Sequence, residues 1–316
     1  MEYRVLGNTG IKVSRMCFGG LTVGPLQANL PIEVGAEVIA EAFNRGVNFI
    51  DTAQLYKTYP YIKRALEICE KKDIVIASKS YAYDEETAKK SLDEALTELN
   101  RDTIDIFLLH EQESEHTLRG HYEALKYYLK MKEMGIIRAV GISTHTIRAV
   151  EAAAKMEEID VIHPIINIKG IGIQDGSRDE MLKAIKEAYK NGKGIYGMKP
   201  IGGGNLIHSV DESLDYAINI NELHSIAVGM QTKEEVVANV LKFSGEQVPD
   251  EVLNKISKKP RRLHIDDWCE KCGSCVKHCK HHALNIVNER VVVDTDKCVL
   301  CGYCSSYCPQ FCIKIV

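Results

Sequence analysis

The chain has 316 residues, a net charge of −4, a pI near 6.3 and 45% apolar residues. These values are typical of a folded globular protein, and they exclude a disordered chain or a basic nucleic-acid-binding surface. The N-terminus has no apolar leader, and no stretch reaches the roughly 18 apolar residues of a membrane span. We therefore expect a cytoplasmic protein with neither nucleic acid nor a membrane as partner.

The first predicted element is a β-hairpin at residues 2–14, where apolar and polar residues alternate around a turn from Asn8 to Gly10. It precedes a long series of alternating elements, and we expect it to close the bottom of the domain that they form.

Short apolar, β-branched runs then alternate with helical patterns from residue 15 to residue 242. The segment 87–100, for example, has apolar residues at helical spacing. The eight runs are 14–20, 47–52, 74–80, 104–110, 138–143, 161–167, 194–200 and 225–230. Eight βα units predict an α/β fold, a (β/α)8 TIM barrel. The alternative is an open doubly wound sheet, whose glycine fingerprint G-x-G-x-x-G does not follow the first run.

Four candidate catalytic side chains lie at or just beyond the C-terminal ends of the second, third and fourth runs: Asp51, Tyr56, Lys79 and His110. In a barrel these positions lie at the carboxyl ends of the strands, where active sites form. Their order and contexts, NFIDTAQLY, IVIASKS and DIFLLH, resemble the aldo-keto reductase family. The resemblance covers about residues 1–240, including the opening YRVLGNTGIKVS, and implies that these four residues are a catalytic tetrad.

The chemistry of carbonyl reduction explains why these residue types would gather. A carbonyl that accepts hydride develops negative charge on oxygen, so Tyr56 is expected to supply a proton as general acid and to act as general base in alcohol oxidation. Lys79 is expected to stabilise the phenolate, with Asp51 holding the ammonium in place. His110 is expected to position or polarise the carbonyl of a small-molecule substrate.

The resemblance also implies a nicotinamide cofactor, NAD(P)H, at the barrel mouth. Ser143 matches a carboxamide contact and Asn239 an adenine contact, whereas Thr144, His163, Met198 and Glu235 depart from the residues usual in the family. Glycines after the seventh and eighth runs are expected to form a phosphate site; the alternative is that they only form a tight turn. These glycines are Gly202, Gly203, Gly204 and Gly229.

The sequence divides into a barrel at residues 1–244, a linker at 245–265 and a C-terminal domain at 266–316. The linker is polar and ends in the basic run KKPRR at 258–262, which favours a solvated connection over a docking site.

The C-terminal domain repeats the spacing C-x2-C-x2-C-x3-C, which is typical of a small α+β ferredoxin-like domain with two [4Fe–4S] clusters. In two-cluster ferredoxins the fourth cysteine of each run binds the other cluster. The predicted ligand sets are Cys269, Cys272, Cys275 and Cys308 for one cluster, and Cys298, Cys301, Cys304 and Cys279 for the other.

Two features of this domain differ from the simplest pattern. Lys280 stands where a proline usually follows the fourth cysteine, and Cys312 lies outside both runs. The alternative of two zinc sites is disfavoured, because zinc ribbons use paired C-x2-C hooks.

Nicotinamides move two electrons as hydride, whereas each cluster moves one electron at a time. Three functions remain open. The clusters exchange electrons with a flavin or a substrate in the barrel, with a redox protein as partner. Alternatively, the barrel is a nicotinamide-dependent reductase whose clusters are structural or dock a partner. In the third, the barrel is a non-catalytic redox sensor, which the intact tetrad disfavours.

Overall fold

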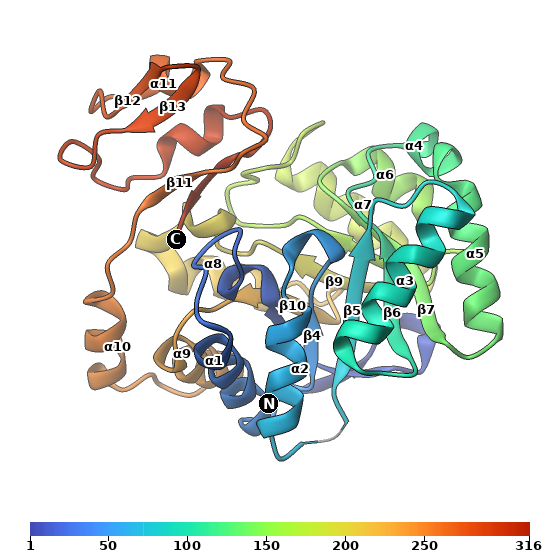
Figure 1. Ribbon diagram of the computed structural model, residues 1–316. Coiled ribbons are helices and arrows are strands. Elements are labelled where there is room, and N and C mark those ends of the chain that lie inside the picture. Colours follow the sequence, from blue (N-terminus) through green and yellow to red (C-terminus); the bar gives the residue numbers. More distant parts are fainter. Residues whose placement is uncertain (72) are drawn as a thin grey trace.

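The computed structural model describes residues 1–71 and 73–316 and shows a barrel with a smaller module beside one end (Figure 1). Eight parallel strands close the barrel in the order β10-β3-β4-β5-β6-β7-β8-β9, and each falls on one of the eight predicted runs. The strands are β3 (Met16–Gly19), β4 (Phe49–Asp51), β5 (Val75–Ser80), β6 (Ile104–Leu109), β7 (Ile137–Thr144), β8 (Val161–Pro164), β9 (Gly194–Met198) and β10 (Ser225–Gly229). The predicted TIM barrel is confirmed.

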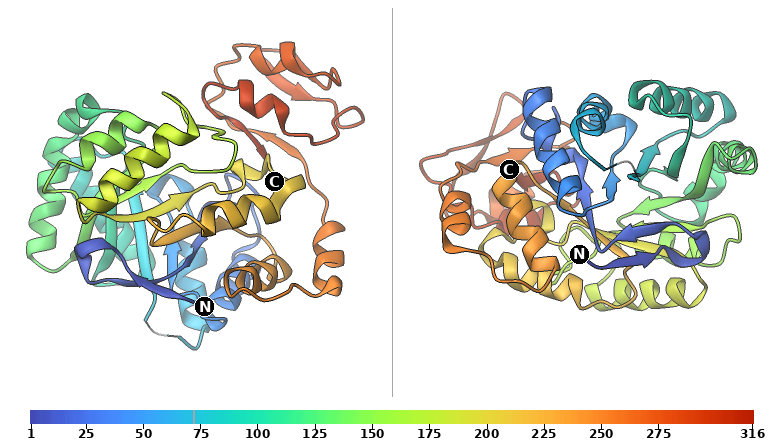
Figure 2. Two further views of the ribbon diagram at one scale, coloured as in Figure 1. Left: turned by 180° about the vertical axis from the view of Figure 1, so that it is seen from behind. Right: turned by 90° about the horizontal axis from the view of Figure 1, so that it is seen from below.

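The N-terminal hairpin consists of β1 (Tyr3–Val5) and β2 (Lys12–Ser14), paired antiparallel on either side of the 3-10 helix η1 (Gly7–Thr9). Leu6 and Ile11 are fully buried in one apolar cluster with inward-facing residues of the barrel strands. The view from below shows the hairpin lying across the end of the barrel (Figure 2). It therefore closes the bottom of the barrel and leaves the carboxyl ends of the strands available for a site.

In the described residues between 32 and 243, nine helices surround the strands. They are α1 (Ile32–Asn44), α2 (Tyr59–Ile68), α3 (Glu85–Leu99), α4 (Glu115–Gly120), α5 (Tyr122–Glu133), α6 (Ile147–Ala153), α7 (Arg178–Lys190), α8 (Val210–Ile218) and α9 (Lys233–Phe243). Short 3-10 helices lie in the loops: η2 (Gly20–Val23), η3 (Gln54–Tyr56), η4 (Gly202–Gly204) and η5 (Ile207–Ser209).

Helix α3 shows how the local sequence sets these elements. Asp84 is the N-cap residue, and its side chain accepts a hydrogen bond from the Thr87 amide at 2.8 Å. The Thr87 hydroxyl in turn accepts a hydrogen bond from the Asp84 amide, which completes a capping box. Ala88, Leu92 and other residues of the predicted apolar face are buried.

After the barrel, α10 (Asp250–Ser257) packs against α9, and the chain then rises along one flank to the module (Figure 1). The module contains two antiparallel strand pairs, β11 (Leu263–Ile265) with β14 (Ile313–Ile315) and β12 (Leu284–Val287) with β13 (Arg290–Val293). Helix α11 (Ser274–His278) and the 3-10 helix η6 (Tyr303–Tyr307) complete it. Residues 263–265 were expected in the linker, but they form β11 because the last strand of the chain returns to pair with them.

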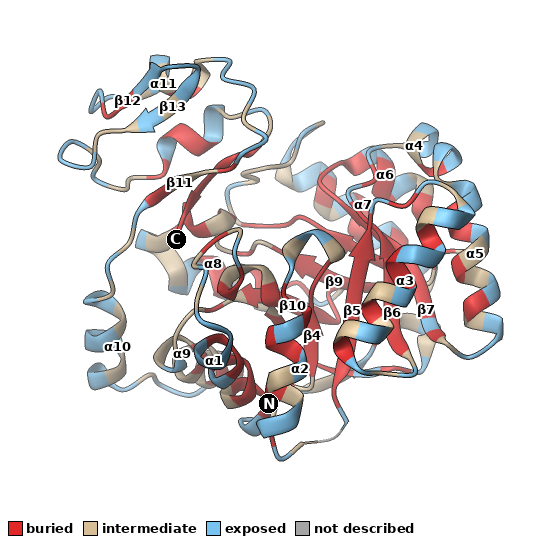
Figure 3. Cartoon of the chain, viewed as in Figure 1, coloured by how far each residue is buried: buried red, intermediate tan, exposed pale blue. Residues whose placement is uncertain are grey.

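The module lies at the end of the barrel toward which the arrowhead of β5 points (Figure 1). Burial is continuous through the barrel strands and extends into β14, whereas the outer part of the module is largely exposed (Figure 3). In the described part of the chain, no helix has the length and apolar character needed to cross a membrane.

Candidate active site and cluster sites

A buried ion pair joins the ends of the second and third barrel strands. Asp51 ends β4, and Lys79 lies near the end of β5, which pairs with β4 in parallel register. The Lys79 ammonium donates hydrogen bonds to both carboxylate oxygens of Asp51 at 2.9 and 2.8 Å, and to the carbonyl oxygen of Thr52 at 2.6 Å. Because the Lys79 side chain is only 1% exposed, this pairing is what allows a charge at this position.

Tyr56 and His110 complete the predicted tetrad. The Lys79 Nζ lies 4.8 Å from the centroid of the Tyr56 ring, and the Tyr56 hydroxyl lies 3.4 Å from Nε2 of His110. Tyr56 is the last residue of η3, and His110 follows β6 directly. The structure thus brings together all four side chains from separate elements.

The pKa of Tyr56 differs in direction from the sequence-based expectation. Burial raises it well above its ordinary value, and the charges of Asp51 and Glu111 raise it further. The Lys79 ammonium donates its hydrogen bonds to Asp51 and Thr52, and it lies over the Tyr56 ring, 4.8 Å from the ring centroid. Tyr56 therefore keeps its proton in this arrangement and is a neutral phenol, not a phenolate.

His110 is held as a neutral imidazole. Burial lowers its pKa well below the ordinary value, and the charges of Lys79 and Lys199 add to this effect. The Tyr81 ring stacks on it with centroids 4.5 Å apart, and Nδ1 of His110 is buried without a hydrogen-bond partner in the described chain. A neutral imidazole in this position can orient a carbonyl group by hydrogen bonding.

Two further residues at this site were not identified from the sequence as part of the tetrad's surroundings. The Tyr196 hydroxyl donates a hydrogen bond to Oδ1 of Asp51 at 2.9 Å, and the His163 ring stacks on Tyr196 with centroids 3.8 Å apart. Nδ1 of His163 donates to the Tyr196 carbonyl oxygen at 2.6 Å, and burial lowers the His163 pKa to about 4. Tyr196 therefore holds the Asp51 carboxylate directly, and His163 holds Tyr196. The sequence could have indicated these two residues only through their positions on β8 and β9, where their side chains point into the barrel.

Lys199 is a second basic group at the barrel mouth. Its Nζ lies 2.7 Å from Nε2 of His145, and burial, followed by the charge of Lys314, lowers its pKa to about 7. Its backbone has φ of +58°, a left-handed conformation that is unusual for lysine. The sequence shows it only as the residue after Met198, so only the structure reveals its partner.

The residues expected to contact a nicotinamide have structural contacts of their own. Ser143 accepts a hydrogen bond from the Glu111 amide through its hydroxyl at 2.9 Å. Gly229 lies under Thr22, where an added Cβ would be 2.2 Å from Cγ2 of that residue. Asn239 lies on α9 and is partly exposed.

The glycine loop of η4 does not fit a dinucleotide phosphate in this arrangement. Gly202, Gly203 and Gly204 all have positive φ, as a phosphate-binding loop can require. A Cβ on Gly204, however, would lie only 2.0 Å from the carbonyl oxygen of Ile315. The last strand of the module thus lies where a phosphate would approach the loop.

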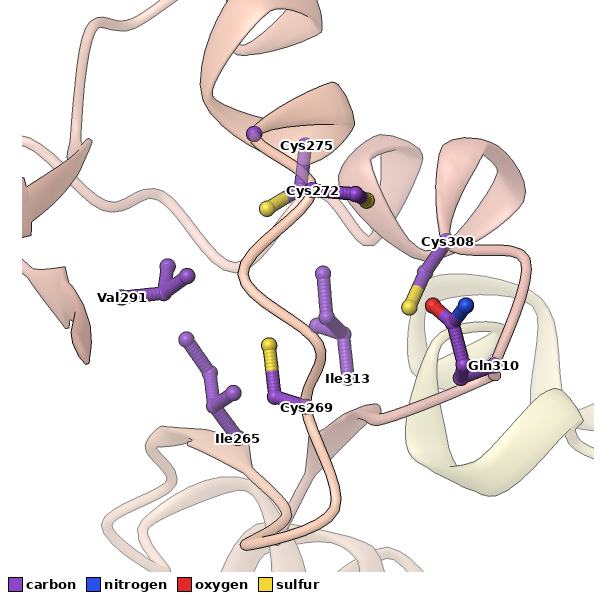
Figure 4. Close-up of a pocket in the computed structure, with 9 residues that line it drawn as sticks. Ile265, Cys269, Cys272, Cys275, Val291, Cys308, Gln310 and Ile313 are labelled. Carbon is purple, nitrogen blue, oxygen red and sulfur yellow. The ribbon is translucent and has the colours of Figure 1, made fainter. Parts of the chain in front are cut away.

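The module has two cavities that match the two predicted ligand sets. The first is lined by Cys269, Cys272, Cys275 and Cys308, together with apolar residues of three strands (Figure 4). The second is lined by Cys279, Cys298, Cys301 and Cys304. Each cavity thus takes three cysteines from one run and the fourth from the other. These residues fit two [4Fe–4S] clusters.

The fourth cysteine of each run has an equivalent environment. The Ala283 amide points to Sγ of Cys279 at 3.4 Å, and the Cys312 amide points to Sγ of Cys308 at 3.2 Å. Hydrogen bonds of this kind stabilise thiolates and tune cluster potentials. Among residues 1–71 and 73–316, no three His, Cys, Asp or Glu side chains are close enough to hold one metal ion, whereas a cube binds each thiolate at a separate iron.

Comparisons with known proteins agree with this architecture. Residues 15–227 match the aldo/keto reductase family, and residues 262–310 match a 4Fe-4S dicluster domain. The chain is 25% identical to an L-galactose dehydrogenase of Arabidopsis thaliana, covering 76% of this chain and 87% of the relative. It is 25% identical to a D/L-glyceraldehyde reductase of Hypocrea jecorina, covering 82% and 88%.

A solved structure supports the fold. An aldo-keto reductase from Bacillus halodurans superposes with a TM-score of 0.64 at 20% identity, covering 82% of this chain and 96% of that one. The protein is therefore an oxidoreductase that belongs to the aldo/keto reductase family and carries a 4Fe-4S dicluster domain in its C-terminal region.

Proposed function

We propose that the protein reduces a small carbonyl compound, or oxidises the corresponding alcohol, beside Tyr56, and that the iron–sulfur clusters relay the electrons. The observation that carries this proposal is the position of the module. It rests at the carboxyl end of the barrel, where Tyr56, His110, Lys79 and Asp51 meet, with β14 against the η4 loop.

Tyr56 would supply the proton that the carbonyl oxygen needs. Its raised pKa keeps it protonated, and an oxygen that takes up electrons becomes basic enough to accept that proton. His110 would orient the carbonyl oxygen through its neutral ring. The Lys79 ammonium, held by Asp51 near the Tyr56 ring, would limit the charge that develops when the phenol gives up its proton.

The mode of electron delivery restricts the substrate class. When bound, the clusters supply single electrons, so the substrate must hold one unpaired electron between two transfers. Carbonyls conjugated to a second carbonyl or to a double bond can do so, because the electron is delocalised. The full reduction adds two electrons and two protons, one proton from Tyr56 and one from solvent, and gives the alcohol.

The electrons would come from an external one-electron carrier protein, which is the partner that we propose. A flavin beside Tyr56 is the alternative acceptor, because a flavin can exchange either one or two electrons. Anaerobic purification followed by extraction and absorbance spectroscopy will show whether an organic cofactor accompanies the iron.

Replacing Tyr56 with Phe tests the proposal. Dithionite-reduced protein, freed of excess dithionite, is mixed with a 1,2-dicarbonyl such as methylglyoxal, and reoxidation of the clusters is followed by their visible absorbance. We expect Tyr56→Phe to slow this reoxidation about a hundredfold, which is the scale of a lost general acid.

Tyr81→Phe is the matched control. Tyr81 also contacts His110, but its hydroxyl donates to Glu111 at 2.5 Å rather than facing the site of reaction. Its removal should leave the rate within a few fold of the wild type. Equal rates in the wild type and Tyr56→Phe would show that Tyr56 is not the proton donor.

A further inference from the structure

The module covers the phosphate corner of the barrel, the loops after the seventh and eighth strands where TIM barrels bind phosphate groups. At the first loop, β14 lies against Gly203 and Gly204, and the Asn205 side chain donates a hydrogen bond to the carbonyl oxygen of Ile313 at 3.0 Å. His208 donates another to the carbonyl oxygen of Leu300 at 3.1 Å. The module is therefore held against this loop by specific hydrogen bonds and by close packing of the two backbones.

The linker covers the second loop. Glu235, in the first turn of α9, accepts hydrogen bonds at 3.0 Å from both Lys259 and Arg261, and its other oxygen accepts from the amide of Gln231. The next residue, Arg262, pairs through its backbone with Val316 at the chain end. The linker and the last strand therefore close the corner together.

One side chain of the module enters the barrel mouth. Phe311 is 2% exposed, with its ring 6.1 Å from the His145 ring and 5.0 Å from Nζ of Lys199. Its amide donates a hydrogen bond to the carbonyl oxygen of the cluster ligand Cys308 at 3.1 Å. His282 occupies the equivalent place in the other half of the module, where it is exposed. The difference arises because the barrel encloses only one of the two positions.

We infer that the module and linker close the dinucleotide site of this barrel, and that electrons enter it from the cluster of Cys269, Cys272, Cys275 and Cys308 through the Phe311 contact. The closure stands on the contacts alone, whereas the direction of electron flow rests on the proposed function. When bound, the two clusters would supply the two electrons that the carbonyl gains together with two protons, and the external one-electron carrier protein would replace those electrons. No hydride donor is required.

A pair of equivalent glycines tests the closure. Gly302 and Gly273 precede η6 and α11 with φ of +74° and +75°, so alanine imposes the same backbone strain at both. A Cβ on Gly302 would lie 2.4 Å from the carbonyl oxygen of Asn205, whereas a Cβ on Gly273 would meet only a side-chain atom of Ile286 at 3.6 Å. Gly302→Ala thus disturbs the docking of the module, and Gly273→Ala is its control.

The experiment uses anaerobically purified holoprotein whose two clusters are verified by iron content and electron paramagnetic resonance. Binding of NADPH and NADH is measured by nicotinamide fluorescence at millimolar concentration. We expect neither to bind the wild type or Gly273→Ala. We expect Gly302→Ala to bind one of them and to reoxidise its clusters with methylglyoxal roughly a hundredfold more slowly, the scale of a misplaced reacting partner.

Micromolar binding of NADPH or NADH to the wild type would overturn the closure, as would equal behaviour of the two alanine variants. If the closure holds while Tyr56→Phe reoxidises at the wild-type rate, only the proposed function fails. If Gly302→Ala binds nucleotide but its clusters reoxidise normally, electron entry through the Phe311 contact is excluded.

Discussion

Charge at the barrel mouth is distributed unevenly among the buried lysines. Lys79 has Asp51 as its counter-ion, and Lys314 lies 3.4 Å from Asp266. Lys199 instead contacts the neutral ring of His145 and the Phe311 ring. Desolvation without a carboxylate at hydrogen-bond distance explains why the pKa of Lys199 drops to about 7.

The lowered pKa of Lys199 predicts how the stability of the fold depends on pH. Between pH 7 and about 10.4, the ordinary lysine pKa, the unfolded chain keeps the Lys199 proton and the folded chain loses it. Burial of the charged Lys199 therefore lowers the free energy of unfolding, and it does so fully below pH 7. This penalty decreases as the pH rises through the window. We expect Lys199→Met to raise the melting temperature more at pH 6 than at pH 9.

Lys190→Met, at an exposed position on α7, controls for the loss of one positive charge. Melting is followed by circular dichroism under anaerobic conditions. A Lys199→Met effect that is equal at the two pH values would contradict the lowered pKa.

At the scale of elements, the module is a repeat whose halves match at the offset that separates Cys269 from Cys298. Gly273 matches Gly302, and the rings of His278 and Tyr307, which also match, stack 3.9 Å apart. Each fourth cysteine lies beyond the helical turn of its own half and lines the opposite cavity. The halves are thus linked through their ligands.

This exchange predicts which cluster a cysteine variant loses. Cys279→Ala should damage the cluster of Cys298, Cys301 and Cys304, leaving about half of the iron and the cluster of its own run intact. Iron and sulfide analysis with electron paramagnetic resonance measures both. Loss of the cluster of its own run instead would show that the ligands are not exchanged.

Cys312→Ala is the matched control for this variant. Cys312 is buried outside both cavities, and Ala283 is its equivalent in the other half. Alanine is therefore compatible with this environment, and both clusters should be retained. Zinc in place of iron after anaerobic expression would contradict the cluster assignment altogether.

At the scale of the whole molecule, the barrel and module form one continuous structure. The tetrad lies at the carboxyl ends of the barrel strands, and the hairpin closes the opposite end. The module covers the phosphate corner. The module is therefore in position to contribute to chemistry in the barrel, rather than being a distant appendage.

Removing the clusters without unfolding the barrel tests this integration. Anaerobic treatment with an iron chelator and oxidant should abolish reduction of methylglyoxal by an external reduced ferredoxin, because the clusters would carry the electrons from the ferredoxin to the barrel. Circular dichroism verifies that the barrel is retained. Turnover that persists at the level of the holoprotein would leave the clusters with a structural or docking role.

The sequence by itself predicted the barrel from local periodicity and the two cysteine sets from their spacing. It predicted the four tetrad positions only through the resemblance of their contexts to the aldo-keto reductase family. It could not reveal that Tyr196 donates a hydrogen bond to Asp51 and that His163 packs on Tyr196, since these contacts join strands far apart in the chain. The upward shift of the Tyr56 pKa likewise depends on burial, which only packing defines. Only the tertiary structure shows the surroundings of Gly202–Gly204. The sequence predicts a phosphate-binding loop there, whereas in the structure β14 covers this loop.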